Sequence, residues 1–109
     1  MTVYIGLFEF EGPNLSPPDL QDEPGVYAIL HCFEEEYELV ETGEHDSLRD
    51  WAQSIDFEKM RSQCSGTLSL AAYYTDLPQA ARQAIVESIL KEFDEELRIE
   101  PQRETVSKY

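Results

Sequence analysis

Hydrophobic and polar positions follow strand-like patterns in four stretches of the chain. Residues 3–10 are rich in aromatic and β-branched side chains, and residues 25–33 and 67–74 are nearly continuous apolar runs. Such runs are typical of strands that are buried in a core. Residues 37–42 alternate between apolar and polar side chains, which predicts a strand that pairs with 25–33 as a hairpin.

Two further stretches follow a helical period. The first helix is expected after Asp46 or Ser47, because either side chain can cap a helix start through its oxygen. Its apolar side is formed by Leu48, Trp51, Ala52 and Ile55. A short second helix is expected over residues 57–63. A long helix is expected from Pro78 to about Leu97, since proline suits a first helical turn and one apolar stripe continues along the stretch. That stripe consists of Ala81, Ala84, Ile85, Ile89, Leu90 and Phe93.

This order of elements predicts an α+β fold. We expect a small mixed or antiparallel sheet of about three to four strands with helices packed on it. The chain has 109 residues, which is enough for one domain, and we place that domain at residues 1–98. The domain includes the N-terminal strand 3–10 and an irregular, proline-rich loop over residues 11–24. The polar residues 99–109 are expected to form a flexible tail.

Charge narrows the classes of partner. Eight Lys and Arg residues against 23 Asp and Glu residues give a formal net charge of −15. Nucleic-acid binding is disfavoured, because it requires cationic groups that displace counterions from phosphate. Anionic membrane surfaces are disfavoured for the same reason. We expect a basic protein partner, and the oligomeric state stays open, since an apolar patch would still permit a dimer.

The compartment follows from the same sequence. No apolar run approaches the roughly 20 residues that span a bilayer, and residues 1–5 lack the basic and apolar segments of a signal peptide. A cytoplasmic location is therefore expected. The two cysteines, Cys32 and Cys64, are expected to be free thiols, since small secreted domains carry more cysteines, and a redox role for them is left open.

One segment resembles a known family. Pro24-Gly25-Val26-Tyr27-Ala28-Ile29 is similar to the start of the GIY-YIG nuclease signature, and Glu41-Thr42-Gly43 ends a second strand at a matching distance. The expected helix, strand and long helix follow in the order of that family. Cys64-Ser65-Gly66-Thr67-Leu68, Ala72-Tyr73-Tyr74-Thr75 and Arg82 resemble a bacterial subgroup of small stand-alone members. The resemblance covers residues 24 to about 97.

The resemblance implies a site in which most functional positions are changed. In active members, two tyrosines, an arginine on the first helix and a glutamate on the long helix cleave a phosphodiester with a divalent metal. Tyr27 matches the first tyrosine, and Gly43 matches the glycine. Glu41 stands at the second tyrosine, Trp51 at the arginine and Val86 at the glutamate. The resemblance therefore implies a scaffold without catalytic residues, cofactor or metal.

Three hypotheses follow from these residues. The leading one is a non-catalytic GIY-YIG-fold protein that serves as an acidic protein-binding or regulatory module. The alternative is a divergent endonuclease with a rearranged site of Tyr27, Arg49 and Glu87, in which Glu87 would hold Mg²⁺ or Mn²⁺. The third is an unrelated α+β protein, which a sheet order lacking the hairpin of residues 25–42 at its start would favour.

Tyr27 and Trp51 each have two interpretations. Tyr27 is either a core tyrosine or a residue that retains a binding role. Trp51 is either a core residue of the first helix or an exposed anchor in a partner interface. Apolar residues at the arginine and glutamate positions also predict an apolar patch rimmed by acids, which is typical of a docking surface.

Overall fold

The fold is α+β, as the sequence predicts, and its sheet is larger than expected. The structure is a computed structural model, and it describes residues 2–33, 36–62, 67–99 and 106–108. In these ranges, five strands pair antiparallel and a sixth joins in parallel, in the order β1-β2-β5-β3-β4-β6. Their bounds are β1 (Thr2–Ile5), β2 (Phe8–Leu15), β3 (Gly25–Phe33), β4 (Glu36–His45), β5 (Thr67–Tyr74) and β6 (Val106–Lys108).

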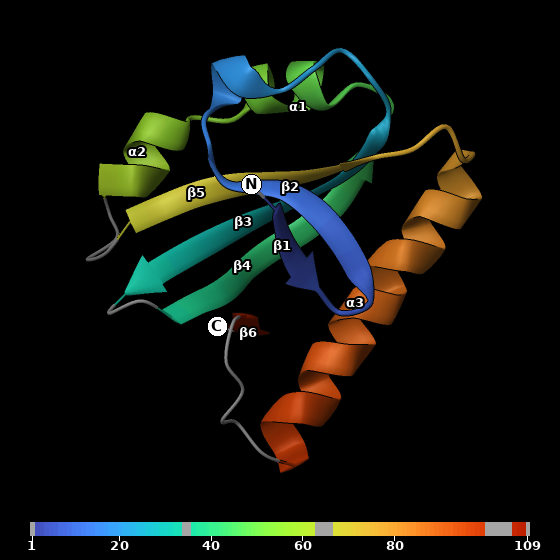
Figure 1. The fold of residues 1–109 in the computed structure, drawn as a ribbon. Helices are drawn as coiled ribbons and strands as arrows, with labels where there is room; N and C mark the ends of the chain where they lie inside the picture. The colour runs from blue at the N-terminus through green and yellow to red at the C-terminus, as the bar shows by residue number, and fades with distance from the viewer. Residues whose placement is uncertain (1, 34–35, 63–66, 100–105, 109) are drawn as a thin grey trace.

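Within the described residues, three α-helices and one short 3-10 helix accompany the sheet. They are η1 (Pro17–Asp19), α1 (Leu48–Ser54), α2 (Phe57–Ser62) and α3 (Gln79–Ile99). Figure 1 shows α1 and α2 above the sheet and α3 on its other side. The predicted hairpin, both short helices, the strand over 67–74 and the long helix are all confirmed within two or three residues at their ends.

The central strand β3 separates two apolar clusters, because successive strand residues point to opposite faces. On the side of α1 and α2, Tyr27 and Ile29 pack with Leu48, Trp51 and other residues of these helices. On the side of α3, the alternate residues of β3 pack against the long helix. That second cluster contains Ile5, Phe10, Val26, Ala28, Leu30, Leu39, Ala71, Ile85, Val86 and Ile89.

The prediction of a single strand over residues 3–10 is wrong in one respect, because this segment forms a hairpin of two strands. Gly6 and Leu7 form a two-residue turn, and Ile5 pairs with Phe8 directly across it. Gly6 has φ +65°, a left-handed conformation that glycine adopts without strain. The second strand continues to Leu15 and η1 follows, so the expected irregular loop over residues 11–24 contains regular structure.

The C-terminal segment also differs from the expectation of a flexible tail over residues 99–109. Val106–Lys108 forms β6, which pairs in parallel with Tyr37, Glu38 and Leu39 of β4. The rest of that segment, residues 100–105 and 109, lies outside the described residues, as do residues 34 and 35 between β3 and β4. None of the described helices combines the length and the apolarity that crossing a membrane requires.

Candidate functional site

Four of the five positions matched to the nuclease signature lie together at one side of β3. Tyr27 on β3 is paired with Gly43 on β4, and its hydroxyl donates a hydrogen bond of 3.0 Å to Oε2 of Glu41. The Tyr27 ring stacks on the indole of Trp51 on α1, with the ring centroids 3.7 Å apart and the planes 15° from parallel. The site is thus an aromatic pair with one carboxylate at the phenol.

Gly43 is required by the path of the Tyr27 side chain. A Cβ atom at residue 43 would lie 2.4 Å from the Tyr27 oxygen and 2.6 Å from its Cζ. Both distances are far below van der Waals contact, so a side chain at this position would displace the ring. The glycine therefore has a steric role here: it leaves space for the ring between β4 and Trp51.

The environment keeps the phenol of Tyr27 neutral. Burial, the negative charge of Glu41 and the hydrogen bond to Glu41 together raise the pKa of Tyr27 to about 12. A general base works best when its pKa lies near the working pH. At neutral pH the Tyr27 hydroxyl is therefore a hydrogen-bond donor to Glu41 rather than a base that activates water.

Burial decides between the two interpretations of both aromatic residues. The exposed fraction is 7% for Trp51 and 9% for Tyr27, so both are core residues. The interpretation of Trp51 as an exposed anchor is wrong. The expected apolar patch at this position is wrong as well, because the indole fills the space beside Tyr27 and leaves almost no apolar surface in water.

Val86, the fifth matched position, lies on the opposite side of the sheet. It is 3% exposed and belongs to the apolar cluster beneath α3, with Ile85 and Ile89. Tyr27 belongs to the cluster beneath α1. Because β3 separates the two clusters, Val86 takes no part in the aromatic site and serves to anchor α3.

The rearranged set of Tyr27, Arg49 and Glu87 does not converge. Arg49 is an exposed residue of α1, and Glu87 is an exposed residue of α3, which packs on the other side of β3. Oε2 of Glu87 accepts a hydrogen bond of 3.4 Å from Gln83 one turn earlier. Across residues 2–33, 36–62, 67–99 and 106–108, no group of three or more His, Cys, Asp or Glu side chains is placed to hold a metal ion.

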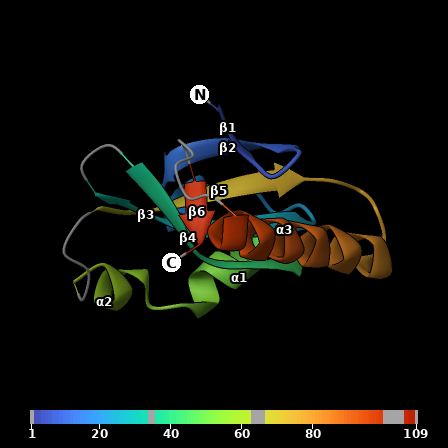
Figure 2. The ribbon, with the colours of Figure 1, turned by 90° about the horizontal axis from the view of Figure 1, so that it is seen from below.

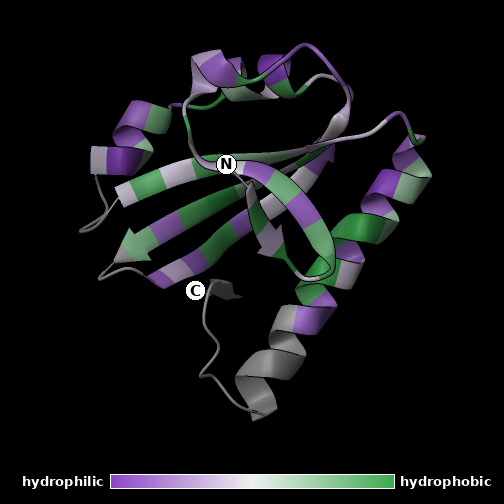
Figure 3. Ribbon diagram, in the orientation of Figure 1, coloured by the Kyte–Doolittle hydropathy of each residue, from purple (hydrophilic) through white to green (hydrophobic). Residues whose placement is uncertain are grey.

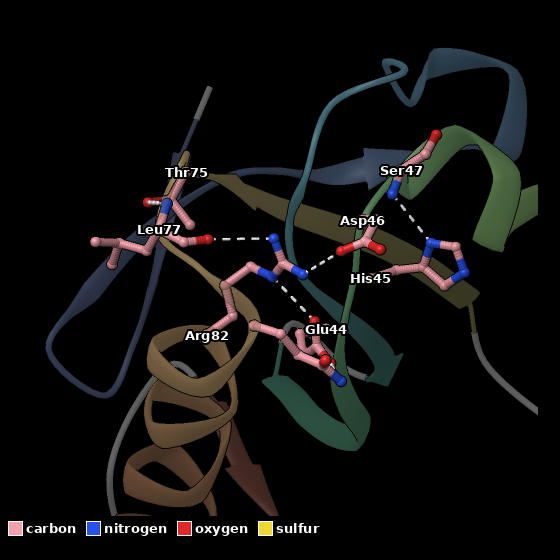
Figure 4. Close-up of polar contacts among 8 residues, drawn as sticks. Glu44, His45, Asp46, Ser47, Thr75, Leu77 and Arg82 are labelled. Atoms are coloured by element: carbon pink, nitrogen blue, oxygen red, sulfur yellow. Dashed lines mark hydrogen bonds and ion pairs between the residues drawn. The ribbon is translucent and has the colours of Figure 1, made fainter.

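A second polar site lies at the end of β4, and Figure 4 shows its side chains. Arg82 of α3 is only 4% exposed. Its Nε donates to Oε1 of Glu44 at 2.9 Å, its Nη1 donates to the carbonyl of Leu77 at 3.2 Å, and its Nη2 donates to Oδ1 of Asp46. Burial opposes the charge of Arg82, but the ion pairs with Asp46 and Glu44 outweigh it and raise the pKa of Arg82.

This arginine connects three elements at one point. Glu44 lies near the end of β4, and Asp46 directly follows the strand. Ser47 comes next as the cap of α1, where its Oγ accepts from the backbone N–H of Asp50 at 3.2 Å. The backbone N–H of Ser47 in turn donates to Nδ1 of His45 at 3.0 Å. Arg82 therefore fixes the first turn of α3 to the segment that positions α1, and with it Trp51.

Arg82 belongs to the segments that carry the family resemblance, and its sequence context predicted no contact for it. A signal was present, since residue 82 precedes Ile85, Val86 and Ile89 at the helical spacing of the buried stripe. A charged residue in such a stripe requires a buried partner. The partner, Glu44, could not be chosen from the sequence, because 23 carboxylates are available.

Carboxylates also surround Tyr74 at the end of β5. Its oxygen accepts a hydrogen bond of 3.0 Å from the backbone N–H of Gln21. Burial raises the pKa of Tyr74, and the negative charges of Glu11, Glu23 and Asp19 add to this effect, although the hydrogen bond from Gln21 opposes it. The region around Tyr74 therefore carries a concentrated negative charge.

Cysteine chemistry adds little to the site. Cys32 is a half-buried free thiol on β3, as expected. Cys64 lies outside the described residues.

Comparison of the chain with protein-family models, with curated proteins and with solved structures finds no match in any of the three.

Proposed function

We propose that this chain is a non-catalytic protein of the GIY-YIG fold that acts as an acidic protein-binding or regulatory module with a basic protein partner. The observation that carries the proposal is the stacking of Trp51 on Tyr27. Trp51 stands at the position of the catalytic arginine in the resemblance. The space in which water and phosphate would meet is therefore filled by an indole.

The order of elements supports the choice of scaffold. The hairpin β3–β4 is followed by α1, α2, β5 and α3, which is the order that the resemblance implies. A sheet order lacking the hairpin of residues 25–42 at its start would have favoured an unrelated α+β protein; the hairpin is present, and β1 and β2 precede it. The additional strands β1 and β2 extend the sheet beyond β5 and leave this order unchanged.

Charge supports a basic partner. The formal net charge is −15, and two of the few cations are already bound to carboxylates within the chain. Arg82 pairs with Glu44 and Asp46, and Arg61 pairs with Glu58 at 2.7 Å. These pairs leave less positive charge available for phosphate, so a basic protein surface is the partner that the electrostatics favour.

The alternative of a metal-dependent endonuclease receives no support from the placement of its residues. Arg49 and Glu87 are exposed on helices at opposite sides of β3. A metal-assisted cleavage requires the metal ligand, the arginine and the tyrosine within a few ångström of one phosphate.

A cleavage assay tests the loss of catalysis. Supercoiled plasmid is incubated with the purified protein and Mg²⁺ or Mn²⁺, beside the Tyr27→Phe and Glu87→Ala variants. We expect the same background nicking from all three proteins. Metal-dependent cleavage that either substitution abolishes would overturn the proposal.

A binding assay tests the partner class. The tagged protein is incubated with extract of its native cells at about 50 mM and about 500 mM salt. We expect a protein of high isoelectric point to be retained at the lower salt and released at the higher salt. Retention of no basic protein at the lower salt would contradict the proposed function.

A further inference from the structure

The β1–β2 hairpin has one face in the core and one face in water. Val3, Ile5, Phe8 and Phe10 point into the apolar cluster beneath α3. The other four residues, Thr2, Tyr4, Glu9 and Glu11, are exposed, and we call them the outer face. Figure 3 shows this alternation of hydrophobic and hydrophilic residues along the hairpin.

The helices that cover the neighbouring strands leave the outer face uncovered. Glu11 is paired with Ala72 of β5, and paired residues point to the same face of a sheet. Ala72 is buried in the cluster beneath α1 and α2, whereas Glu11 is exposed. Figure 2 shows the hairpin at one side of the molecule and α1 and α2 at the other.

β1 also has an unpaired edge. It stands first in the strand order, and among the described residues its only partner strand is β2. Ile5 and Phe8 flank a two-residue turn, so they form a hydrogen-bonded pair, and the backbone groups of Tyr4 and Thr2 point away from β2. Thr2–Ile5 contains neither lysine nor proline, the residues that commonly protect a sheet edge.

The outer face determines which segment fits this edge. Tyr4 is 60% exposed and is paired with Glu9, and Thr2 is paired with Glu11. A strand added beside β1 would turn every second side chain toward the outer face. A lysine or arginine on that side would lie next to Tyr4, where it gains both a cation–π contact and the attraction of the two glutamates. The intervening side chains would lie beside Val3 and Ile5, where apolar residues fit.

We propose that the edge of β1 binds an extended segment of a partner protein by strand addition, with alternating basic and apolar side chains. The inference rests on the proposed function, because it assigns a surface to the basic partner. A second copy of the chain is a poorer occupant, since it would bring two outer faces and two net charges of −15 together.

The test uses a synthetic peptide of alternating lysine and valine, with an alternating glutamate and valine peptide as its control. Binding is measured by fluorescence anisotropy, and the fold of each protein variant is checked by circular dichroism. Tyr4→Pro is compared with Tyr4→Thr, because both remove the ring and only proline removes the outward N–H. We expect about tenfold weaker binding for Tyr4→Pro than for Tyr4→Thr, which corresponds to one lost hydrogen bond.

Charge is tested with two matched double variants. Glu9→Gln with Glu11→Gln removes the charges of the outer face, and Asp22→Asn with Asp76→Asn removes the same charge from exposed positions elsewhere. We expect about fivefold weaker binding for the first pair and little change for the second.

Four outcomes would overturn the inference. Equal losses in both double variants would show general attraction to an acidic protein, and the proposed function would stand without this surface. Equal losses in both Tyr4 variants would show that binding does not use the outward N–H of β1. No preference of the wild type for the lysine peptide would exclude the edge as a basic site. A dimer in sedimentation velocity that Tyr4→Pro dissociates would assign the edge to a second copy. Failure of the extract assay, by contrast, would refute the proposed function itself.

Discussion

The ring of Tyr27 lies flat against the indole of Trp51, with the two centroids 3.7 Å apart. The contact joins β3 to α1, and Gly43 and Glu41 of β4 complete the enclosure of the phenol. Stacked aromatic pairs contribute about 0.5–1.5 kcal/mol beyond the burial of their area. The residues that replace a catalytic set in the resemblance thus form a structural contact.

Trp51→Ala is expected to lower the free energy of unfolding by about 3–5 kcal/mol, since it leaves a cavity and removes the stacking partner of Tyr27. Trp51→Phe keeps a ring and should cost less. Urea unfolding monitored by circular dichroism measures both. Arg49→Ala, at an exposed position of the same helix, should stay within about 0.5 kcal/mol of the wild type. An equal cost for Trp51→Ala and Arg49→Ala would contradict the placement of Trp51 in the core.

The ionisation of Tyr27 is expected to couple folding to alkaline pH. Its pKa is about 12 in the folded protein against an ordinary value of 10.0. Because the folded pKa is raised, the contribution to stability is complete below pH 10.0 and is lost as the pH rises toward 12. The difference of two pKa units corresponds to at most about 3 kcal/mol.

Unfolding in urea at about pH 9 and about pH 11 measures this loss. Tyr27→Phe has no phenol to titrate, so its stability should fall less between the two conditions than that of the wild type. Tyr4→Phe, at an exposed tyrosine, is the control and should behave as the wild type. The same pH dependence in wild type and Tyr27→Phe would refute the assignment.

The elements that the sequence predicted share a clear period or cap. The apolar stripe of α3, the Ser47 cap of α1 and the apolar run of β5 are local signals, and each element formed where its signal lies. The β1–β2 turn was missed because Leu7 keeps the run apolar although it is 81% exposed. The informative signal was a change of phase: the inward residues are odd-numbered before Gly6 and even-numbered from Phe8 onward.

The candidate site was predicted only in part, because its contacts join residues that are distant in the sequence. Helical spacing put Trp51 in line with Leu48 and Ile55 and left a core or an interface position open, which burial decides for the core. Counting from the signature grouped it with Tyr27, Glu41 and Gly43. The stacking of Trp51 on Tyr27 and the ion pairs of Arg82 join residues 24 or more positions apart. Such contacts depend on how α1 and α3 pack on the sheet, which periodicity does not specify.

Arg82→Met is expected to lower the free energy of unfolding by about 3–5 kcal/mol, because it leaves the carboxylate of Glu44 without its cation. The side chain of Glu44 is only 10% exposed, whereas that of Asp46 is 88% exposed. Asp46→Asn should therefore cost at most about 1 kcal/mol. Adding Glu44→Gln to Arg82→Met should recover part of the loss, since no buried charge then remains. Thermal and urea unfolding of the wild type, the two single variants and the double variant measures these differences. Equal effects of Arg82→Met and Asp46→Asn would contradict this account.

Two buried serines are expected to respond to alanine in opposite directions. Ser69 on β5 is 3% exposed, and within the part of the chain that the structure describes its hydroxyl has no hydrogen-bond partner. Ser47 is 8% exposed, and its hydroxyl accepts from the backbone N–H of Asp50 at the start of α1. An unpartnered buried hydroxyl costs free energy, whereas a capping hydroxyl supplies it.

Ser69→Ala should therefore raise the free energy of unfolding by up to about 1 kcal/mol, because it removes a polar group that gains nothing in the core. Ser47→Ala should lower it by about 1 kcal/mol, because the N–H of Asp50 loses its acceptor. Both substitutions delete one oxygen atom, so they differ in hydrogen bonding and hardly in volume. Urea unfolding under one set of conditions compares them directly. A loss of stability in Ser69→Ala as large as that in Ser47→Ala would mean that the Ser69 hydroxyl is satisfied in solution, by water or by a rotated neighbour.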